Sequence, residues 1–165
     1  MWIINPDLLT ARIREQEKIS LSRANGVALD RIQAWLDASI DAYQTVGVET
    51  VLSTDKYRPL VERAKANGFE LRPLYVTLHT ADLNVARVKL RVAQGGHDVD
   101  EEKIRVRRER SFQQLPWFLD QADVARVYDN SGATLKLLAR KSEGVIELDP
   151  TAPEEIRAAI RSLEG

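Results

Sequence analysis

The chain has 165 residues with 24 basic and 25 acidic side chains, a net charge of −1 and no cysteine. The charge balance argues against nucleic acid as a partner, and the lack of cysteine excludes disulfides, thiolate catalysis and cysteine-ligated metals. No apolar run is long enough to cross a membrane, and the N-terminal stretch MWIINPDLLT does not have the pattern of a signal peptide, so we expect one cytoplasmic domain over residues 1–165.

Hydrophobic periodicity predicts alternating strands and helices in the first half of the chain. Residues 2–5 are an apolar run that Pro6 stops, and apolar side chains at helical spacing mark a long helix before Gly47. Turn residues such as Asn67-Gly68 end the shorter segments. The predicted elements are a strand at 2–5, a helix at 8–15, a helix at 26–45, a strand at 48–52 and a helix at 58–66.

The second half continues the alternation and closes with a hairpin and a helix. Thr80 and Asp100 are suitable N-caps for two helices, Pro116 is expected to bound the second of them, and Thr151 with Glu154 forms a capping box. The predicted elements are a strand at 71–79, a helix at 80–94, an arginine-rich helix from 100, a strand at 125–129, a hairpin at 134–148 and a terminal helix.

This order of elements predicts an α/β fold built on a parallel sheet flanked by helices. Ligands of such sheets bind beyond the carboxyl ends of the strands. Polar residues stand at three of these ends, and together they would form a site. They are Asn5 and Asp7 at the first end, Glu49 and Thr50 at the second, and Asp129 and Asn130 at the third.

Two acidic residues at these strand ends each have two interpretations. Asp7 could be a general base for a substrate hydroxyl, or it could be the N-cap of the helix that follows. Glu49 stands within an otherwise apolar predicted strand, where a carboxylate needs a partner. That partner could be a ligand or an arginine of the protein itself.

The segment 91–111, RVAQGGHDVDEEKIRVRRERS, combines a Gly-Gly stop with an arginine-rich helix. At 100° per residue, Arg107, Arg108 and Ser111 fall on the side of Ile104 that should face the protein. Guanidinium groups directed inward need an anion, either an internal carboxylate or a bound phosphate. Arg91, on the other side of the glycines, could face the same anion as Arg107.

Other types of site find little support. His97 is expected at a surface or hinge position, and with His79 as the sole other histidine a metal site is not expected. Neither Ser53 nor Ser131 has a histidine at a spacing known for serine hydrolases.

Several of these segments together resemble the zeta-toxin family of P-loop kinases. The similarity extends over about residues 3–138, and the Gly-Gly-His-Asp-Val block followed by arginines is its most specific part. The matching segments are Asn5-Pro6-Asp7, residues 48–53, residues 91–99, Ile104 with Arg107 and Ser111, and residues 128–132.

The resemblance implies ATP- and Mg²⁺-dependent phosphorylation of a small hydroxyl compound, such as a nucleotide-activated sugar. By position, Asp7 would take the proton of the substrate hydroxyl, and Glu49 with Thr50 would bind the substrate. Arg91 and Arg107 would contact the ATP and stabilise the transferring phosphoryl group. The family also implies a three-layer P-loop NTPase-like sheet and an antitoxin-like protein partner.

One family feature is absent from this sequence. No G-x-x-x-x-G-K-[ST] segment occurs, although this loop and the strand before it normally hold the nucleotide phosphates. Val51 and Arg108 also replace a usual threonine and a usual aromatic residue. We therefore expect an N-terminally truncated kinase domain that is inactive by itself and whose open sheet edge supports a homo-oligomer. The alternative is a non-catalytic binding or interaction module derived from the same fold.

Overall fold

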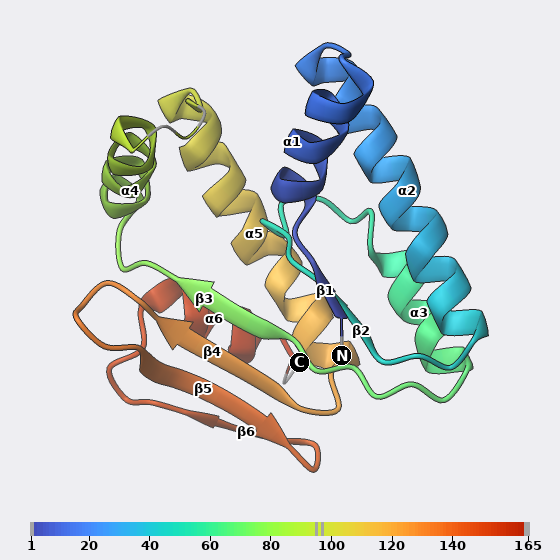
Figure 1. Ribbon diagram of the computed structural model, residues 1–165. Coiled ribbons are helices and arrows are strands. Elements are labelled where there is room, and N and C mark those ends of the chain that lie inside the picture. Colours follow the sequence, from blue (N-terminus) through green and yellow to red (C-terminus); the bar gives the residue numbers. More distant parts are fainter. Residues whose placement is uncertain (1, 95, 97, 164–165) are drawn as a thin grey trace. The chain divides into compact units, whose positions relative to one another are not determined.

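The computed structural model describes residues 2–94, 96 and 98–163 (Figure 1). Gly95 and His97, predicted at the hinge, lie outside the described residues. The chain forms two compact units: unit 1 comprises Met1–Thr50 and Arg58–Phe69, and unit 2 comprises Val51–Tyr57 and Glu70–Gly165. Both contain helices and strands, which confirms the α/β class. That residues 1–165 form a single zeta-toxin-like domain stays a prediction.

Unit 1 pairs two short parallel strands and adds three helices. Its elements are β1 (Trp2–Ile4), α1 (Pro6–Glu17), α2 (Leu21–Asp41), β2 (Val46–Val48) and α3 (Arg58–Ala66). Strands β1 and β2 run parallel, with Ile4 opposite Val48. The first strand and α3 were predicted well, whereas β2 ends before Glu49 instead of including it.

Small and aliphatic side chains hold α1 against α2. Ala24 and Ala28 of α2 are fully buried beside Ile13 of α1, and their short side chains allow close approach of the two helices. Arg63 of α3 forms ion pairs with both Asp37 and Asp41 of α2.

Unit 2 is built on a mixed four-stranded sheet. Its elements are β3 (Leu74–Thr77), α4 (Ala81–Ala93), α5 (Glu101–Gln121), β4 (Ala125–Asp129), β5 (Lys136–Ser142), β6 (Val145–Leu148) and α6 (Glu154–Arg161). The strand order is β3-β4-β5-β6; β3 and β4 are parallel, and the other pairs are antiparallel.

The predicted parallel pairing is thus found in β1–β2 and β3–β4, the predicted C-terminal hairpin and helix are confirmed, and the antiparallel β4–β5 pair makes the sheet of unit 2 mixed. A parallel pair needs a crossover of a dozen or more residues, and the chain between β4 and β5 is much shorter. Between β5 and β6 it turns through Glu143 and Gly144, both with positive φ, as in a tight hairpin.

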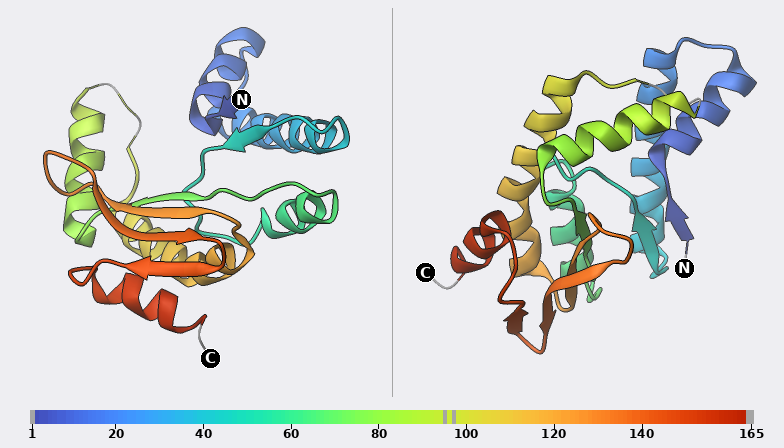
Figure 2. Two further views of the ribbon diagram at one scale, coloured as in Figure 1. Left: turned by 90° about the horizontal axis from the view of Figure 1, so that it is seen from below. Right: turned by 90° about the vertical axis from the view of Figure 1, so that its left-hand side faces the viewer.

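Helices α5 and α6 cover one face of this sheet, as the views in Figure 1 and Figure 2 show. Leu115 and Leu119 of α5 pack with Val127 of β4 and with Ile156 and Ile160 of α6 in one buried cluster. The opposite face of the sheet carries exposed side chains, among them Leu74, Val76 and Leu137.

Several predicted helix boundaries are wrong, and the helix predicted at 26–45 runs from Leu21 to Asp41. Pro116 lies inside α5 and does not bound it, and Pro153, not Thr151, is the N-cap of α6. Thr151 instead directs its N–H and its hydroxyl to the carboxylate of Asp149. In the described part of the chain, no helix combines the length and apolar character needed to cross a membrane.

Candidate functional site

Asn5 joins the carboxyl ends of the two parallel strands of unit 1. Its side-chain Nδ2 donates to Oε2 of Glu49 at 2.7 Å. Its Oδ1 accepts from the backbone N–H groups of Asp7 at 2.9 Å and Leu8 at 3.2 Å. The N–H of Glu49 donates to the carbonyl of Ile4 at 2.9 Å, which extends the ladder by one bond. One asparagine thus caps α1 and holds a carboxylate of the next strand end.

Asp7 lies in the first turn of α1 with an exposed side chain. Its interpretation as the N-cap is wrong, because Asn5 occupies that position. Among the residues that the structure describes, none forms a hydrogen bond or ion pair with the Asp7 carboxylate. The positive end of the helix dipole favours a negative charge here. Asp7 is therefore an accessible, charged acceptor at the strand end.

Glu49 directly follows β2 and is exposed, so it does not stand inside an apolar strand as predicted. Its partner is the amide of Asn5 and not an arginine. The hydrogen bond engages one carboxylate oxygen and leaves lone pairs for a hydroxyl group. Thr50, the next residue, is exposed as well. The structure thus brings Asp7, Glu49 and Thr50 to one end of the β1–β2 pair.

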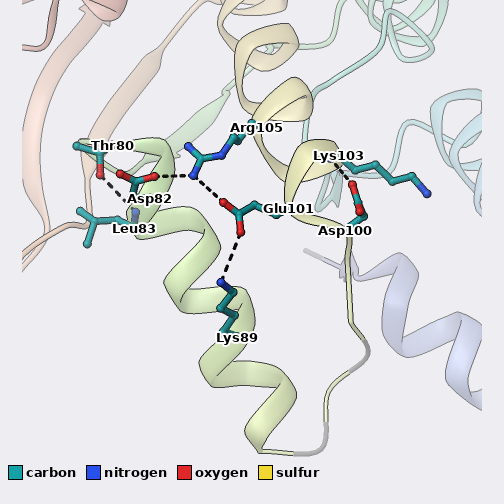
Figure 3. Close-up of polar contacts among 8 residues, drawn as sticks. All are labelled: Thr80, Asp82, Leu83, Lys89, Asp100, Glu101, Lys103 and Arg105. Atoms are coloured by element: carbon teal, nitrogen blue, oxygen red, sulfur yellow. Dashed lines mark hydrogen bonds and ion pairs between the residues drawn. The ribbon is translucent and has the colours of Figure 1, made fainter.

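The predicted arginines belong to unit 2, where ion pairs connect α4 and α5 (Figure 3). Arg105 of α5 donates to Asp82 of α4 at 2.6 Å and to Glu101 at 2.8 Å. Lys89 of α4 lies 3.4 Å from the other oxygen of Glu101. The hydrogen bond from Arg105 is the main cause that lowers the pKa of the Glu101 carboxyl.

Arg108, and not Arg107, is the inward-facing arginine of α5. Its side chain is 13% exposed and donates to the carbonyls of Leu78 and His79 and to Glu155. Of the two predicted kinds of anion, an internal carboxylate or a bound phosphate, Arg108 thus pairs with an internal carboxylate, that of Glu155. Arg107 is exposed, contrary to its predicted inward position, because it lies about 60° from Ile104 around the helix.

Arg91 and Arg107 do not lie at the same level of the α4–α5 pair. The Asp82–Arg105 contact places the start of α4 beside residue 105. Arg91, also exposed, lies nine residues further along α4, which is about 14 Å of helix. Arg91 therefore lies near the end of α4, whereas Arg107 of α5 lies beside the start of α4.

The third predicted strand end is internally satisfied. The Asp129 carboxylate accepts from the N–H of Ser131 at 2.9 Å and from its hydroxyl at 2.5 Å. The same serine oxygen accepts from the backbone N–H of His79 at 2.6 Å. Asp129 and Ser131 therefore join β4 to the end of β3, and the serine proton is directed to a carboxylate.

The residues present do not fit Mg-ATP. No group of three or more histidine or acidic side chains within the described ranges could hold a metal ion. The sequence has no glycine-rich loop with the lysine and hydroxyl that bind nucleotide phosphates and Mg²⁺. The carboxylates of Asp7 and Glu49 in unit 1 accept hydrogen bonds and suit the hydroxyl groups of a ligand, but they do not supply the cationic contacts that bind the phosphates of ATP.

Comparison with known proteins gives one short match. No family model and no solved structure matches the chain. An uncharacterized protein of Haemophilus influenzae is 33% identical over 60 residues, which are 36% of this chain and 43% of that protein. The chain thus spans less than half of the length of this curated relative, and the similarity assigns no activity.

Proposed function

We propose that this chain is a zeta-toxin-like kinase domain that keeps the acceptor side of the reaction, and that unit 1 binds a small hydroxyl compound such as a nucleotide-activated sugar. The observation that carries this proposal is the Asn5–Glu49 hydrogen bond of 2.7 Å. It fixes the Glu49 carboxylate beside Asn5, whose Oδ1 accepts from the backbone N–H of Asp7, at the edge where ligands of parallel sheets bind.

Each residue of the site has a defined role in this proposal. Glu49 accepts a hydrogen bond from one substrate hydroxyl, with Thr50 beside it as a second polar contact. Asp7 accepts the proton of the hydroxyl that would be phosphorylated, a role that suits a carboxylate with no partner among the described residues. Arg91 and Arg107 are the family's candidates for stabilising a transferring phosphoryl group; they belong to unit 2 and have no role in the acceptor site proposed here.

The phosphoryl donor in the family is ATP with Mg²⁺, and the residues of this chain do not supply its binding loop. We therefore expect the chain alone to bind the acceptor without phosphorylating it. An antitoxin-like partner belongs to the same proposal.

Calorimetric titration with UDP-N-acetylglucosamine, a nucleotide-activated amino sugar, tests the proposal. We expect saturable binding that Glu49→Gln weakens at least tenfold, because the amide replaces a charged acceptor. Glu15→Gln, at an exposed glutamate of α1, is the matched control and should not change the affinity. Lack of binding to the unmodified chain, or equal affinities of Glu49→Gln and the control, would contradict the assignment.

A second assay addresses catalysis directly. The chain, Mg-ATP and the same sugar nucleotide are incubated together, and phosphorylated sugar is sought by mass spectrometry. We expect none from the chain alone. Product formation would overturn the inference that the chain is inactive by itself, and Asp7→Asn would then show whether Asp7 is the base.

The alternative, a non-catalytic interaction module, has one observation in its favour. Strand β3 of unit 2 is a sheet edge with exposed apolar side chains.

A further inference from the structure

We propose that strand β3 pairs with β3 of a second copy of this chain, in an antiparallel arrangement that joins two four-stranded sheets into one. This inference does not depend on the acceptor site of unit 1. It rests on the direction of the backbone groups of β3, on the side chains along this strand and on the charges around it.

One side of strand β3 is hydrogen-bonded to β4, and no described strand pairs with its other side. The N–H groups of Arg126 and Asn130 donate to the carbonyls of Pro73 and Thr77, so the odd-numbered residues of β3 face β4. Leu74 and Val76 consequently direct their N–H and C=O groups to the other side. Of the described strands, β4 alone pairs with β3. Four strong hydrogen-bonding groups are thus available along this edge.

The side chains along β3 do not protect this edge. Leu74 is 69% exposed and Val76 is 51% exposed, and the strand Leu74–Thr77 contains no charged residue. Natural proteins usually guard an edge with lysine, proline or inward-pointing charges. Pro73 does not guard it, because its missing N–H would face β4. The other edge of the sheet, β6, carries the charged Glu147, which pairs with Arg140.

A twofold axis fixes the geometry of the pair. Two identical edges related by such an axis run antiparallel, which requires no connection between the strands. With the axis near Tyr75, Leu74 lies opposite Val76 of the second copy, and Val76 opposite its Leu74. The four backbone groups then form two reciprocal pairs of hydrogen bonds, and the exposed apolar side chains meet across the new contact.

The charges around β3 are compatible with this pairing. Arg126 is a charge on the same face, because it lies opposite Leu74 on β4. In the dimer the two copies of Arg126 are separated by three strand spacings, or about 14 Å. That separation exceeds the screening length of about 8 Å at physiological salt, so repulsion between them is weak. The contact is short, and we expect association at about 10 µM to 1 mM protein.

Light scattering over this concentration range provides the first test. We expect the mass to rise from 18.6 kDa towards twice that value. Val76→Lys should abolish the rise, because a lysine at the edge opposes strand pairing. Leu137→Lys, on the same face but on the interior strand β5, is the matched control and should still dimerise. Val145→Lys on β6 controls for the opposite edge.

Disulfide trapping tests the register independently of stability. The chain has no cysteine of its own, so introduced thiols are unambiguous. Opposite residues in this register have Cα atoms about 5.5 Å apart, within the range for a disulfide. A mixture of Leu74→Cys and Val76→Cys chains should therefore form mixed dimers on oxidation at a higher yield than either variant alone.

Several results would overturn the proposal. A monomer mass throughout the range, or a dimer that persists in Val76→Lys, would exclude β3 as the contact. Dissociation by Leu137→Lys would assign association to the sheet face, and dissociation by Val145→Lys would assign it to β6. Circular dichroism of each variant confirms that it is folded before its mass is interpreted.

Discussion

The phenol oxygen of Tyr75 lies 3.0 Å from the hydroxyl oxygen of Ser111, so one hydrogen bond links β3 to α5. Ser111 is 6% exposed, and the Tyr75 ring also packs at a tilt against Phe112. Burial raises the pKa of the Tyr75 phenol above its ordinary value of 10.0, and the hydrogen bond between Tyr75 and Ser111 acts in the opposite direction.

This environment predicts a loss of stability in alkali. Because the folded pKa is raised, the unfolded chain loses the Tyr75 proton first, and stability present below pH 10 falls as the pH rises towards the folded pKa. Tyr75→Phe should reduce this loss, to which Tyr57 also contributes because burial raises its pKa, and should cost about 0.5–1.5 kcal/mol near neutral pH, where Ser111 loses its partner. Urea unfolding at pH 8 and pH 10.5 measures both effects. Tyr43→Phe, at a side chain 71% exposed, should keep the alkaline loss.

The ion pairs between α4 and α5 predict an acid-sensitive contact. The pKa of Glu101 is lowered, so its stabilising effect is present above the ordinary value of 4.5 and is lost as the pH falls through the folded pKa. The protection factors of α4 amides, which correct for the intrinsic slowing of exchange in acid, should therefore fall below about pH 4.5 and also at high salt, because these groups are exposed.

Arg105→Gln should accelerate the same exchange at neutral pH. Arg110→Gln is the matched control, since Arg110 is an exposed arginine of the same helix. Equal exchange in both variants would show that the ion pairs of Arg105 do not hold α4 to α5.

Asn5 combines two roles that substitutions can separate. Asn5→Ala removes the N-cap of α1 together with the bond to Glu49, and should cost about 0.5–2 kcal/mol of unfolding free energy. Asn5→Asp keeps an acceptor for the helix N–H groups but places a second carboxylate beside Glu49. It should therefore retain the cap and still weaken sugar-nucleotide binding. If Asn5→Asp binds as well as the unmodified chain, the alignment of Glu49 by Asn5 does not matter for the ligand.

Local sequence signals predicted those elements whose first and last residues are determined by the neighbouring sequence, without help from distant contacts. Thr80 and Asp100 cap α4 and α5 as expected, and β4 has the predicted bounds. Pro116 does not end α5 as predicted, because the packing of Leu115 and Phe118 in a long helix outweighs the cost of one proline. Whether neighbouring strands run parallel or antiparallel also depends on how β4, β5 and β6 are connected.

The site was predicted in its residue types more than in its contacts. Asn5 and Asp7 were both recognised at a strand end. Which of them caps α1 depends on where the helix begins, and the two residues are only two positions apart. The same applies to Arg107 and Arg108, since a 100° step separates an exposed side chain from a half-buried one. That Glu49 contacts Asn5, 44 residues away, could not be read from spacing at all.

The division into two units has a consequence for biosynthesis. Every residue of unit 1 lies within the first 69 positions, whereas most of unit 2 follows it. The ribosome therefore delivers the complete α1–α2 pair and the Asn5–Glu49 contact while the sheet of β3 to β6 is still to be translated. We expect nascent chains to acquire the proposed acceptor site first, before the strand edge that could join two copies exists.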